Sequence, residues 1–201
     1  RKTHVPYVIY DSSLLNETTR RKHLASDMVM ALEHNALELY YQPIVNLESG
    51  RCEAVEALLR WRHPELGFIP PNEVIQVAEE FQLAEKLGSW VLNTACEQLH
   101  QWQHLGLVDL QMCVNISPGM YQRNLLKLVA KALMEHHIPA SCLVLEVTED
   151  TTMREVKNSL QLMQDLSQQG VHLALDDFGT GYSSLSYLQK LPVSKVKIDR
   201  S

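Results

Sequence analysis

The chain has 201 residues, a formal net charge of −6 and hydrophobic side chains at 45% of its positions. These values exclude collagen-like and intrinsically disordered classes and are typical of a globular domain. The acidic balance argues against a nucleic acid polymer as partner, because such proteins neutralise phosphates with basic residues. No apolar run reaches the ~20 residues of a membrane span, and no secretion signal is evident. We therefore expect a cytoplasmic chain, either alone or as part of a larger, membrane-anchored protein.

Hydrophobic spacing predicts the first elements in chain order. Residues 1–18 form a tail that ends near a turn-like Asp11-Ser12-Ser13 cluster, and a helix follows from Thr19. Strands are expected over 39–45 and 54–61. Two helices come next, one started by Pro70-Pro71-Asn72 and one over 87–102.

Strands and helices then alternate to the end of the chain. Strands are predicted at 110–116, 143–147, 173–175 and 193–198, and helices at 125–136, 154–168 and 183–189. Nearly continuous apolar strands separated by helices are typical of a parallel sheet with helices on its outer faces. The fold class is therefore α/β, although 201 residues are short for the ~250 of a closed eight-stranded barrel.

Polar side chains interrupt these apolar strands at comparable positions. They are Glu56, Asn115, Glu146, Asp176 with Asp177, and Lys197. From Asn115 to Glu146 and from Glu146 to Asp176 the spacing is about one βα unit of ~30 residues. Successive units therefore bring these side chains to one rim of the sheet.

The chemistry of this set favours a metal site. A buried acid costs several kcal/mol unless it is paired or bound to a cation. Carboxylates with one amide suit Mg²⁺ or Mn²⁺ rather than zinc, and adjacent Asp176 and Asp177 suggest two ions. Two such ions are a recurrent device for hydrolysing phosphodiesters, in which Lys197 could orient water or neutralise phosphate. The alternative is an ion network without metal.

Other features have simpler interpretations. Cys113 and Cys142 lie in apolar runs and are expected to be buried free thiols. The nine histidines are scattered; His100 and His104 are expected at the surface, and adjacent His136 and His137 make a poor metal pair. Arg20-Arg21-Lys22 is predicted to be a solvated helix face.

Six motifs occur in order between Leu37 and the end of the chain. They are Tyr41-Gln42-Pro43-Ile44-Val45, Glu56-Ala57-Leu58-Leu59-Arg60-Trp61, Asn115-Ile116-Ser117, Glu146-Val147-Thr148-Glu149, Asp176-Asp177-Phe178-Gly179-Thr180-Gly181 and Lys197-Ile198-Asp199. This set closely resembles the EAL-domain family of cyclic-di-GMP phosphodiesterases. The resemblance implies a TIM-like (β/α) barrel that uses two Mg²⁺ or Mn²⁺ ions to open cyclic-di-GMP to linear pGpG.

The resemblance also implies a role for each matched residue. Lys197, Glu56 and Asp176 are the implied catalytic residues. The implied metal ligands are Glu56, Asn115, Glu146, Asp176 and Asp177, and the implied substrate contacts are Gln42, Leu58 and Arg60. Glu149 matches a glutamate that braces the 177–184 loop, a segment tied in this family to dimerisation, so a homodimer is expected.

The same resemblance predicts the domain limits. The family continues past the Lys-Ile-Asp motif with two more strands, so about six of eight strands are expected in this chain, which we interpret as incomplete at its C-terminus. Residues 1–18 resemble a linker after an upstream domain of the GGDEF type, and residues 19–201 form the EAL domain.

Two other functions remain open. One is a receptor or interaction module that binds cyclic-di-GMP or a protein without cleavage. The other is a different TIM-barrel metal enzyme, such as an enolase-type isomerase, which fits the rim carboxylates but not the Asp176–Gly181 motif.

Overall fold

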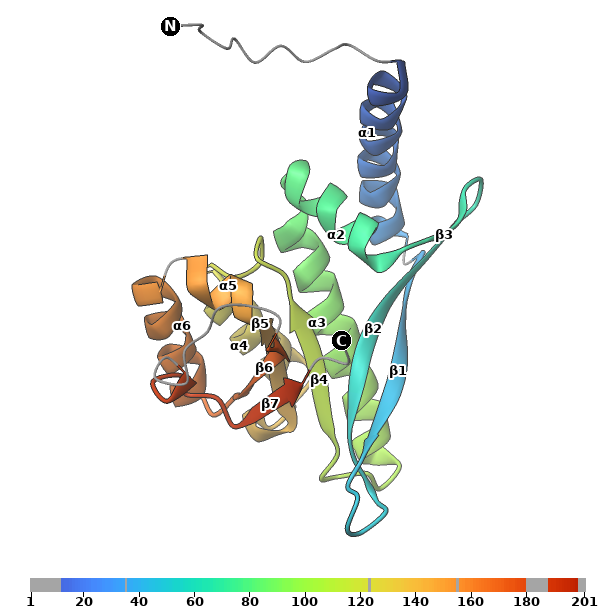
Figure 1. Ribbon diagram of the computed structural model, residues 1–201. Helices are drawn as coiled ribbons and strands as arrows, with labels where there is room; N and C mark the ends of the chain where they lie inside the picture. The colour runs from blue at the N-terminus through green and yellow to red at the C-terminus, as the bar shows by residue number, and fades with distance from the viewer. Residues whose placement is uncertain (1–11, 35, 123, 155, 180–187, 199–201) are drawn as a thin grey trace, which may run out of the picture.

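The computed structural model describes residues 12–34, 36–122, 124–154, 156–179 and 188–198 (Figure 1). Its first element is helix α1 (Ser12–Glu33), which begins seven residues before the expected start at Thr19. The predicted turn near Ser12 is therefore wrong. Serine and aspartate favour helix starts as well as turns, so this local pattern does not separate the two.

An antiparallel hairpin follows α1. It consists of β1 (Leu37–Val45) and β2 (Cys52–His63), which align Gln42 with Glu56. The Asn46 side chain closes the connecting turn by accepting backbone N–H bonds from Glu48 and Ser49. A short strand β3 (Gly67–Ile69), which the sequence pattern did not predict, pairs with the far end of β2.

Two helices lead from the hairpin to the parallel strands. The first is α2 (Pro71–Glu80), with Pro71 in its first turn, where proline's missing N–H costs nothing. The chain then reverses at Gln82, whose φ is +58°, and Leu83 N–H donates to Ala78 O at 2.7 Å, as in a Schellman cap. The second is α3 (Ala84–His104).

The predicted alternation of strands and helices is confirmed in the rest of the described chain. The elements are β4 (Gln111–Ile116), α4 (Leu125–Glu135), a 3-10 turn (Ala140–Cys142), β5 (Leu143–Thr148), α5 (Glu149–Arg154), α6 (Val156–Gln168), β6 (His172–Phe178) and β7 (Lys195–Ile198). The helix expected over 154–168 is preceded by the separate helix α5. Most of the helix expected over 183–189 lies outside the described residues.

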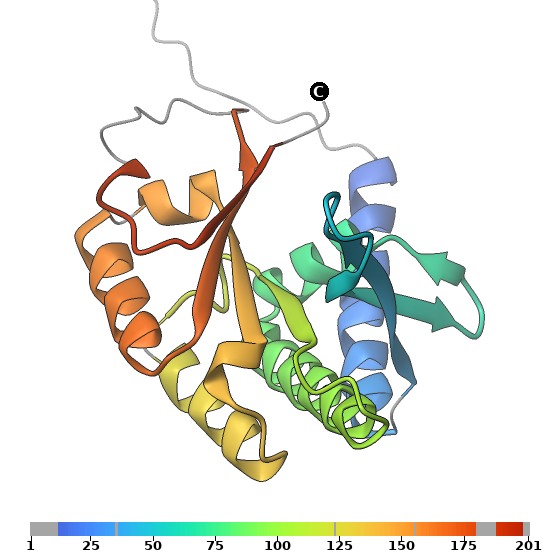
Figure 2. The same cartoon turned by 90° about the horizontal axis from the view of Figure 1, so that it is seen from below.

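The strands form one sheet in the order β1-β2-β4-β5-β6-β7, with β3 attached to β2. The pairs from β2 to β7 along this order are parallel, as predicted, whereas β1 and β3 run antiparallel to β2. A short turn can join only antiparallel neighbours, which explains both exceptions. The sheet curves, and α3, α4 and α6 lie on its outer side (Figure 2). The α/β class and the TIM-like arrangement are confirmed.

The largest core lies between the outer face of the sheet and these helices. Leu92, Leu99, Val129 and Leu166 contribute to it and are almost completely buried. Trp102 of α3 meets Tyr41 of β1 edge-on, with 4.9 Å between the ring centroids. This core holds the helices against the curved sheet.

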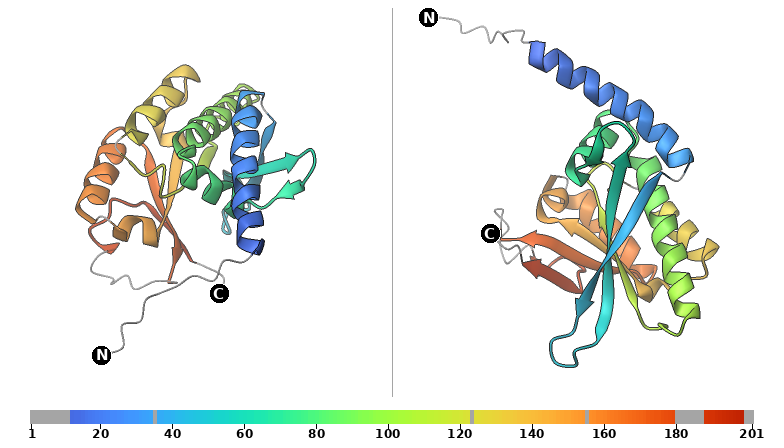
Figure 3. Two further views of the ribbon diagram at one scale, coloured as in Figure 1. Left: turned by 90° about the horizontal axis from the view of Figure 1, so that it is seen from above. Right: turned by 90° about the vertical axis from the view of Figure 1, so that its right-hand side faces the viewer.

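A second core attaches α1 to the domain. Leu24 and Met28 of α1 pack with Trp61, Ile69 and Val74, and α1 runs beside α2 and extends away from the sheet (Figure 3). Arg20 pairs with Glu73, and Arg21 pairs with Glu80 at 3.2 Å. The expected solvated face is confirmed, because Arg20 and Lys22 are exposed and Arg21 is partly exposed, and the ion pairs with α2 lie at the surface. None of the helices in the described ranges is long and apolar enough to cross a membrane.

A third, small core lies on the inner face of the sheet. It consists of Ala54, Cys113, Val144 and Ala174, one from each of β2, β4, β5 and β6. Each of these residues stands two positions before a polar residue singled out in the sequence. Because residues two apart in a strand share a face, this layer forms the floor beneath those polar side chains.

Candidate active site

Four strands place polar side chains above this floor. Glu56 comes from β2, Asn115 from β4, Glu146 from β5 and Asp176 from β6. The register pairs Asn115 directly with Glu146. The sequence prediction that successive βα units bring these residues to one rim is borne out by the structure.

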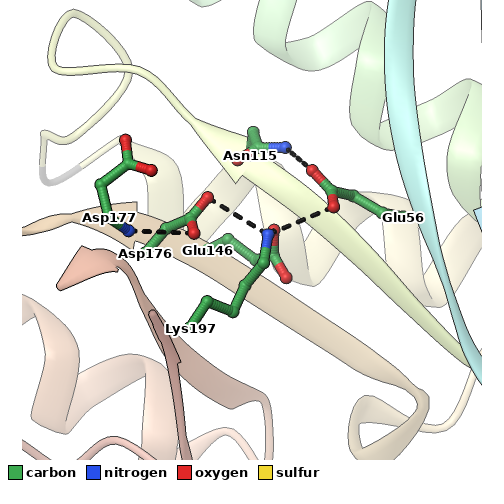
Figure 4. A network of polar contacts seen from close by, with 6 residues as sticks. All are labelled: Glu56, Asn115, Glu146, Asp176, Asp177 and Lys197. Carbon is green, nitrogen blue, oxygen red and sulfur yellow. Dashed lines mark hydrogen bonds and ion pairs between the residues drawn. The ribbon is translucent and has the colours of Figure 1, made fainter. Parts of the chain in front are cut away.

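Lys197 of β7 connects the carboxylates (Figure 4). Its Nζ donates to Glu146 Oε2 at 2.7 Å, and to Glu56 Oε2 and Asp176 Oδ2 at 3.2 Å each. Asn115 Nδ2 donates to Glu56 Oε1 at 2.8 Å and orients that carboxylate from the other side. Five side chains from five strands thus form one polar network.

Burial makes the charges of this network interdependent. Glu146 is 2% exposed, and its burial raises its pKa, although the hydrogen bond and the charge of Lys197 oppose this. Burial would lower the pKa of Lys197, but the hydrogen bond and charge of Glu146, together with the charges of Glu56 and Asp176, raise it well above its ordinary value. With the three carboxylates ionised, one ammonium leaves a net negative charge that favours a further cation.

Asp177 is placed differently from the other four predicted ligands. Its φ is +54°, a left-handed conformation that aspartate adopts more easily than most residues. Its backbone N–H donates to Asp176 Oδ1 at 3.0 Å, and its carboxylate points away from Lys197 (Figure 4). The structure therefore brings together Glu56, Asn115, Glu146, Asp176 and Lys197, but not the carboxylate of Asp177.

The donor chemistry of this network fits a hard divalent cation. Three carboxylates and one amide oxygen are ligands that Mg²⁺ and Mn²⁺ prefer. Within the described residues, no three His, Cys, Asp or Glu side chains are already arranged to hold a metal ion. Here the carboxylates converge on the Lys197 ammonium instead.

The hairpin places the three expected substrate contacts beside the network. Gln42 lies opposite Glu56 in the register, and Leu58 and Arg60 follow Glu56 on the same face of β2. Arg60 Nη1 donates to Leu59 O at 2.8 Å. The Arg60 guanidinium carbon also lies 5.5 Å from the ring centroid of Tyr40. Sequence reasoning missed Tyr40, although its two-residue spacing from Gln42 already placed both on one face.

Glu149, the expected loop brace, is buried just after β5. Its Oε2 accepts the backbone N–H of Gly179 at 3.4 Å. Residues 180–184 of the predicted braced loop lie outside the described residues.

Two of the simpler interpretations can also be compared with the structure. Cys113 and Cys142 are buried free thiols, as predicted, and so is Cys96. The histidines are less scattered than expected, because His100 stands near both His104 and His137, with ring centroids 4.3 Å and 6.4 Å away. His100 and His104 are four residues apart on α3, so helical spacing places them together, whereas the nearness of His137, just after α4, depends on the packing of α3 and α4.

The fold and this network define an α/β domain of TIM-like arrangement with an acidic site on the rim of its sheet. The chain belongs to the EAL domain family, whose model matches residues 25–201. The family expectation drawn from the six motifs is therefore confirmed.

Among curated relatives, the chain is 43% identical over 195 residues to the bifunctional diguanylate cyclase/cyclic di-GMP phosphodiesterase MucR of Pseudomonas aeruginosa. It is 38% identical over 193 residues to the cyclic di-GMP phosphodiesterase NbdA of the same organism. Each match covers 96% of this chain, but only 28% of MucR and 25% of NbdA. The chain thus spans about a quarter of the length of these relatives.

Solved structures show the same likeness. The PaMucR phosphodiesterase in complex with c-di-GMP matches with a TM-score of 0.84 and 45% identity, over 89% of this chain and 72% of that one. The FimX EAL domain from Pseudomonas aeruginosa bound to c-di-GMP matches with a TM-score of 0.78 and 29% identity, over 88% of this chain and 71% of that one.

Proposed function

We propose that this domain is a metal-dependent phosphodiesterase that hydrolyses cyclic-di-GMP to linear 5′-pGpG in bacterial second-messenger signalling. The observation that carries the proposal is the convergence of Glu56, Glu146 and Asp176 on Lys197, with Asn115 on Glu56. The family membership and the names of MucR and NbdA support the choice of substrate.

In this reaction, water adds its oxygen to one phosphorus atom, and the bond from that phosphorus to a ribose 3′ oxygen breaks. The 3′ oxygen takes up a proton, and the product carries a free 5′ phosphate. Lys197 orients the attacking water or neutralises the phosphate, because its ammonium lies among the carboxylates of Glu56, Glu146 and Asp176. Lys197, Glu56 and Asp176 are the proposed catalytic residues.

The proposed cofactor is a pair of Mg²⁺ or Mn²⁺ ions. Bound ions of this kind supply Lewis-acid stabilisation of the phosphate and lower the pKa of water. Glu56, Asn115, Glu146 and Asp176 would hold the first ion, and Asp176 with Asp177 would hold the second. Binding requires the ammonium of Lys197 to give up part of its contact with the carboxylates.

Gln42, Leu58 and Arg60 are the proposed contacts to the dinucleotide, and Glu149 the proposed brace of the loop after β6. Their positions on the hairpin beside Glu56 support the first three roles. The Gly179 contact supports the role of Glu149. A homodimer and a cytoplasmic location belong to the same proposal.

The proposed domain limits are a linker over residues 1–18, which follows an upstream domain of the GGDEF type, and an EAL domain over residues 19–201. Two observations bear on these limits without defining them. The family match begins at residue 25, and MucR, which the chain matches over 28% of its length, is named as both a cyclase and a phosphodiesterase.

Replacement of Glu56 tests the proposed activity. Glu56→Ala should reduce pGpG formation at least 10²-fold, because removal of a key electrostatic group usually costs that much. The measurement is product formation by chromatography with Mn²⁺ or Mg²⁺ added, and EDTA should stop the wild-type reaction. Glu53→Ala is the matched control, since Glu53 is exposed on the same strand and lies three residues from Glu56.

If wild-type protein with either metal forms no pGpG, or if Glu56→Ala keeps full turnover, the proposed activity is wrong. Binding of cyclic-di-GMP by calorimetry without product over long incubation would instead support a receptor.

A further inference from the structure

The inner face of β1 carries an aromatic side chain that the proposed mechanism does not use. Leu39 and Tyr41 of β1 pack against the core on the helix side of the sheet. Because side chains alternate along a strand, Tyr40 lies on the other face, together with Gln42. This is the face on which Glu56 meets Lys197.

The register places Tyr40 beside the proposed substrate contacts. Tyr40 lies directly opposite Leu58, just as Gln42 lies opposite Glu56. Residues two apart in a strand are about 7 Å apart along it. Tyr40 therefore lies about 7 Å along the hairpin from the Gln42–Glu56 pair. It lies on the side of that pair toward Arg60.

The ring of Tyr40 is also available to a ligand. The residue is 53% exposed, so solvent and ligands can reach its ring. The guanidinium of Arg60 lies over the ring at 5.5 Å from its centroid. A tyrosine held against an arginine presents a flat, oriented surface, and such surfaces stack on nucleobases with little regard to the hydrogen-bonding edge of the base.

We propose that Tyr40 is a stacking platform for one guanine base of the cyclic dinucleotide, and so a further residue that determines substrate affinity. This inference rests on the proposed function. The ring itself is what matters: the hydroxyl group plays no part, and the phosphate chemistry stays with the carboxylates and Lys197.

The test compares wild type with Tyr40→Phe, which keeps the ring, and Tyr40→Leu, which keeps an apolar side chain without a ring. Stacking on an aromatic side chain is worth about 1–3 kcal/mol per base, so Tyr40→Leu should raise KM for cyclic-di-GMP about 5- to 150-fold. We expect kcat to stay within about threefold, and Tyr40→Phe to keep KM within about threefold. Phe68→Leu is the control, because Phe68 is 55% exposed and lies on β3, opposite Arg62 and six residues along β2 from Glu56.

A spectroscopic measurement separates stacking from a structural role. A cyclic dinucleotide with 2-aminopurine in place of one guanine should lose fluorescence when it binds wild type or Tyr40→Phe, and keep more of it with Tyr40→Leu. An unchanged KM and equal quenching in Tyr40→Leu would overturn the stacking role while leaving the phosphodiesterase intact. Failure of wild type to bind or cleave cyclic-di-GMP would overturn the proposed function itself, and the stacking role with it.

Discussion

Lys197 provides the positive charge that partly balances the carboxylates of the rim. Its ammonium contacts carboxylates from three other strands, and one of them, Glu146, has almost no access to water. A buried carboxylate is costly without a positive partner. In the absence of a divalent cation, Lys197 therefore contributes to the stability of the sheet as well as to the proposed chemistry.

Replacement of this lysine should make that contribution measurable. Breaking a buried ion pair by removing one partner costs about 3–5 kcal/mol, and Lys197→Met should cost about 2–4 kcal/mol in unfolding free energy because Lys197 keeps partial contact with water. Urea denaturation at pH 7 without added divalent metal measures this loss of unfolding free energy. The double variant Lys197→Met/Glu146→Gln should recover at least half of the loss, and Lys195→Met, an exposed neighbour on β7, should change little. A loss below about 0.5 kcal/mol for Lys197→Met would contradict this account.

A second prediction at the residue scale concerns Cys96 and the pH dependence of the unfolding free energy. Burial raises the pKa of its thiol to about 12, from about 9 in an accessible cysteine. Above pH 9 the unfolded chain loses this proton while the folded chain keeps it, so rising pH favours unfolding between pH 9 and 12, at about 1.4 kcal/mol per pH unit. The stability advantage of wild type over Cys96→Ala should thus shrink by about 1–2 kcal/mol between pH 8 and pH 10 in guanidinium titrations. An advantage that stays constant over this range would refute the buried-thiol explanation.

At the scale of elements, the site depends on strand alternation and on register. Ala54, Cys113, Val144 and Ala174 fill the inner face, and the polar residue two positions later in each strand stands above them. A slip of one residue in any of these strands would turn its polar side chain toward the helices. The small floor layer therefore helps to specify the register that assembles the site.

The helix α1 is the element that the local pattern described least well. Its start is expected at Thr19, yet it begins at Ser12, and its solvent-exposed arginines also pair with glutamates of α2. Its inner face is an integral part of the domain core. In addition, Oδ2 of Asp27 on α1 lies 3.2 Å from Nε2 of the buried His63 at the end of β2.

Two methionines of α1 allow a matched test of this packing. Met28 is fully buried, whereas Met30, two residues away, is 53% exposed. Met28→Ala should lower the unfolding free energy by about 2–5 kcal/mol because it leaves a cavity in the second core, and Met30→Ala should change it by less than about 0.5 kcal/mol. Thermal or urea denaturation of the two variants makes the comparison. Equal effects would show that α1 is not packed against α2 and β2 in solution.

At the scale of the whole molecule, a curved sheet gathers side chains that are far apart in the chain. Glu56 and Lys197 are separated by most of the sequence, yet their charged groups lie 3.2 Å apart. The outer helices hold the curvature through the large core, and the inner face remains for the polar network. Tyr40 and Arg60 extend this inner face along the hairpin, away from the ion network.

Most of the strands and of the candidate site could be predicted from the amino-acid sequence. The strands are predicted from their apolar runs, and a charged or amide side chain in such a run is conspicuous. This singles out Glu56, Asn115, Glu146, Asp176 and Lys197. Tyr40 was missed because an aromatic residue in a strand is ordinary, and only the register beside Leu58 and the contact with Arg60 distinguish it. The grouping of His100 with His137 was missed for the same kind of reason, since it arises from packing between elements.

The sequence by itself determined the α/β class, the family and the composition of the rim site, because these follow from local periodicity and from the residue types that interrupt it. Tertiary structure alone decided the incorporation of α1 into the core and the direction of each rim side chain. The Asp177 carboxylate points away from Lys197 although its neighbour Asp176 points toward it. These outcomes depend on distances between atoms that the chain brings together only on folding, and no pattern along the sequence encodes such distances directly.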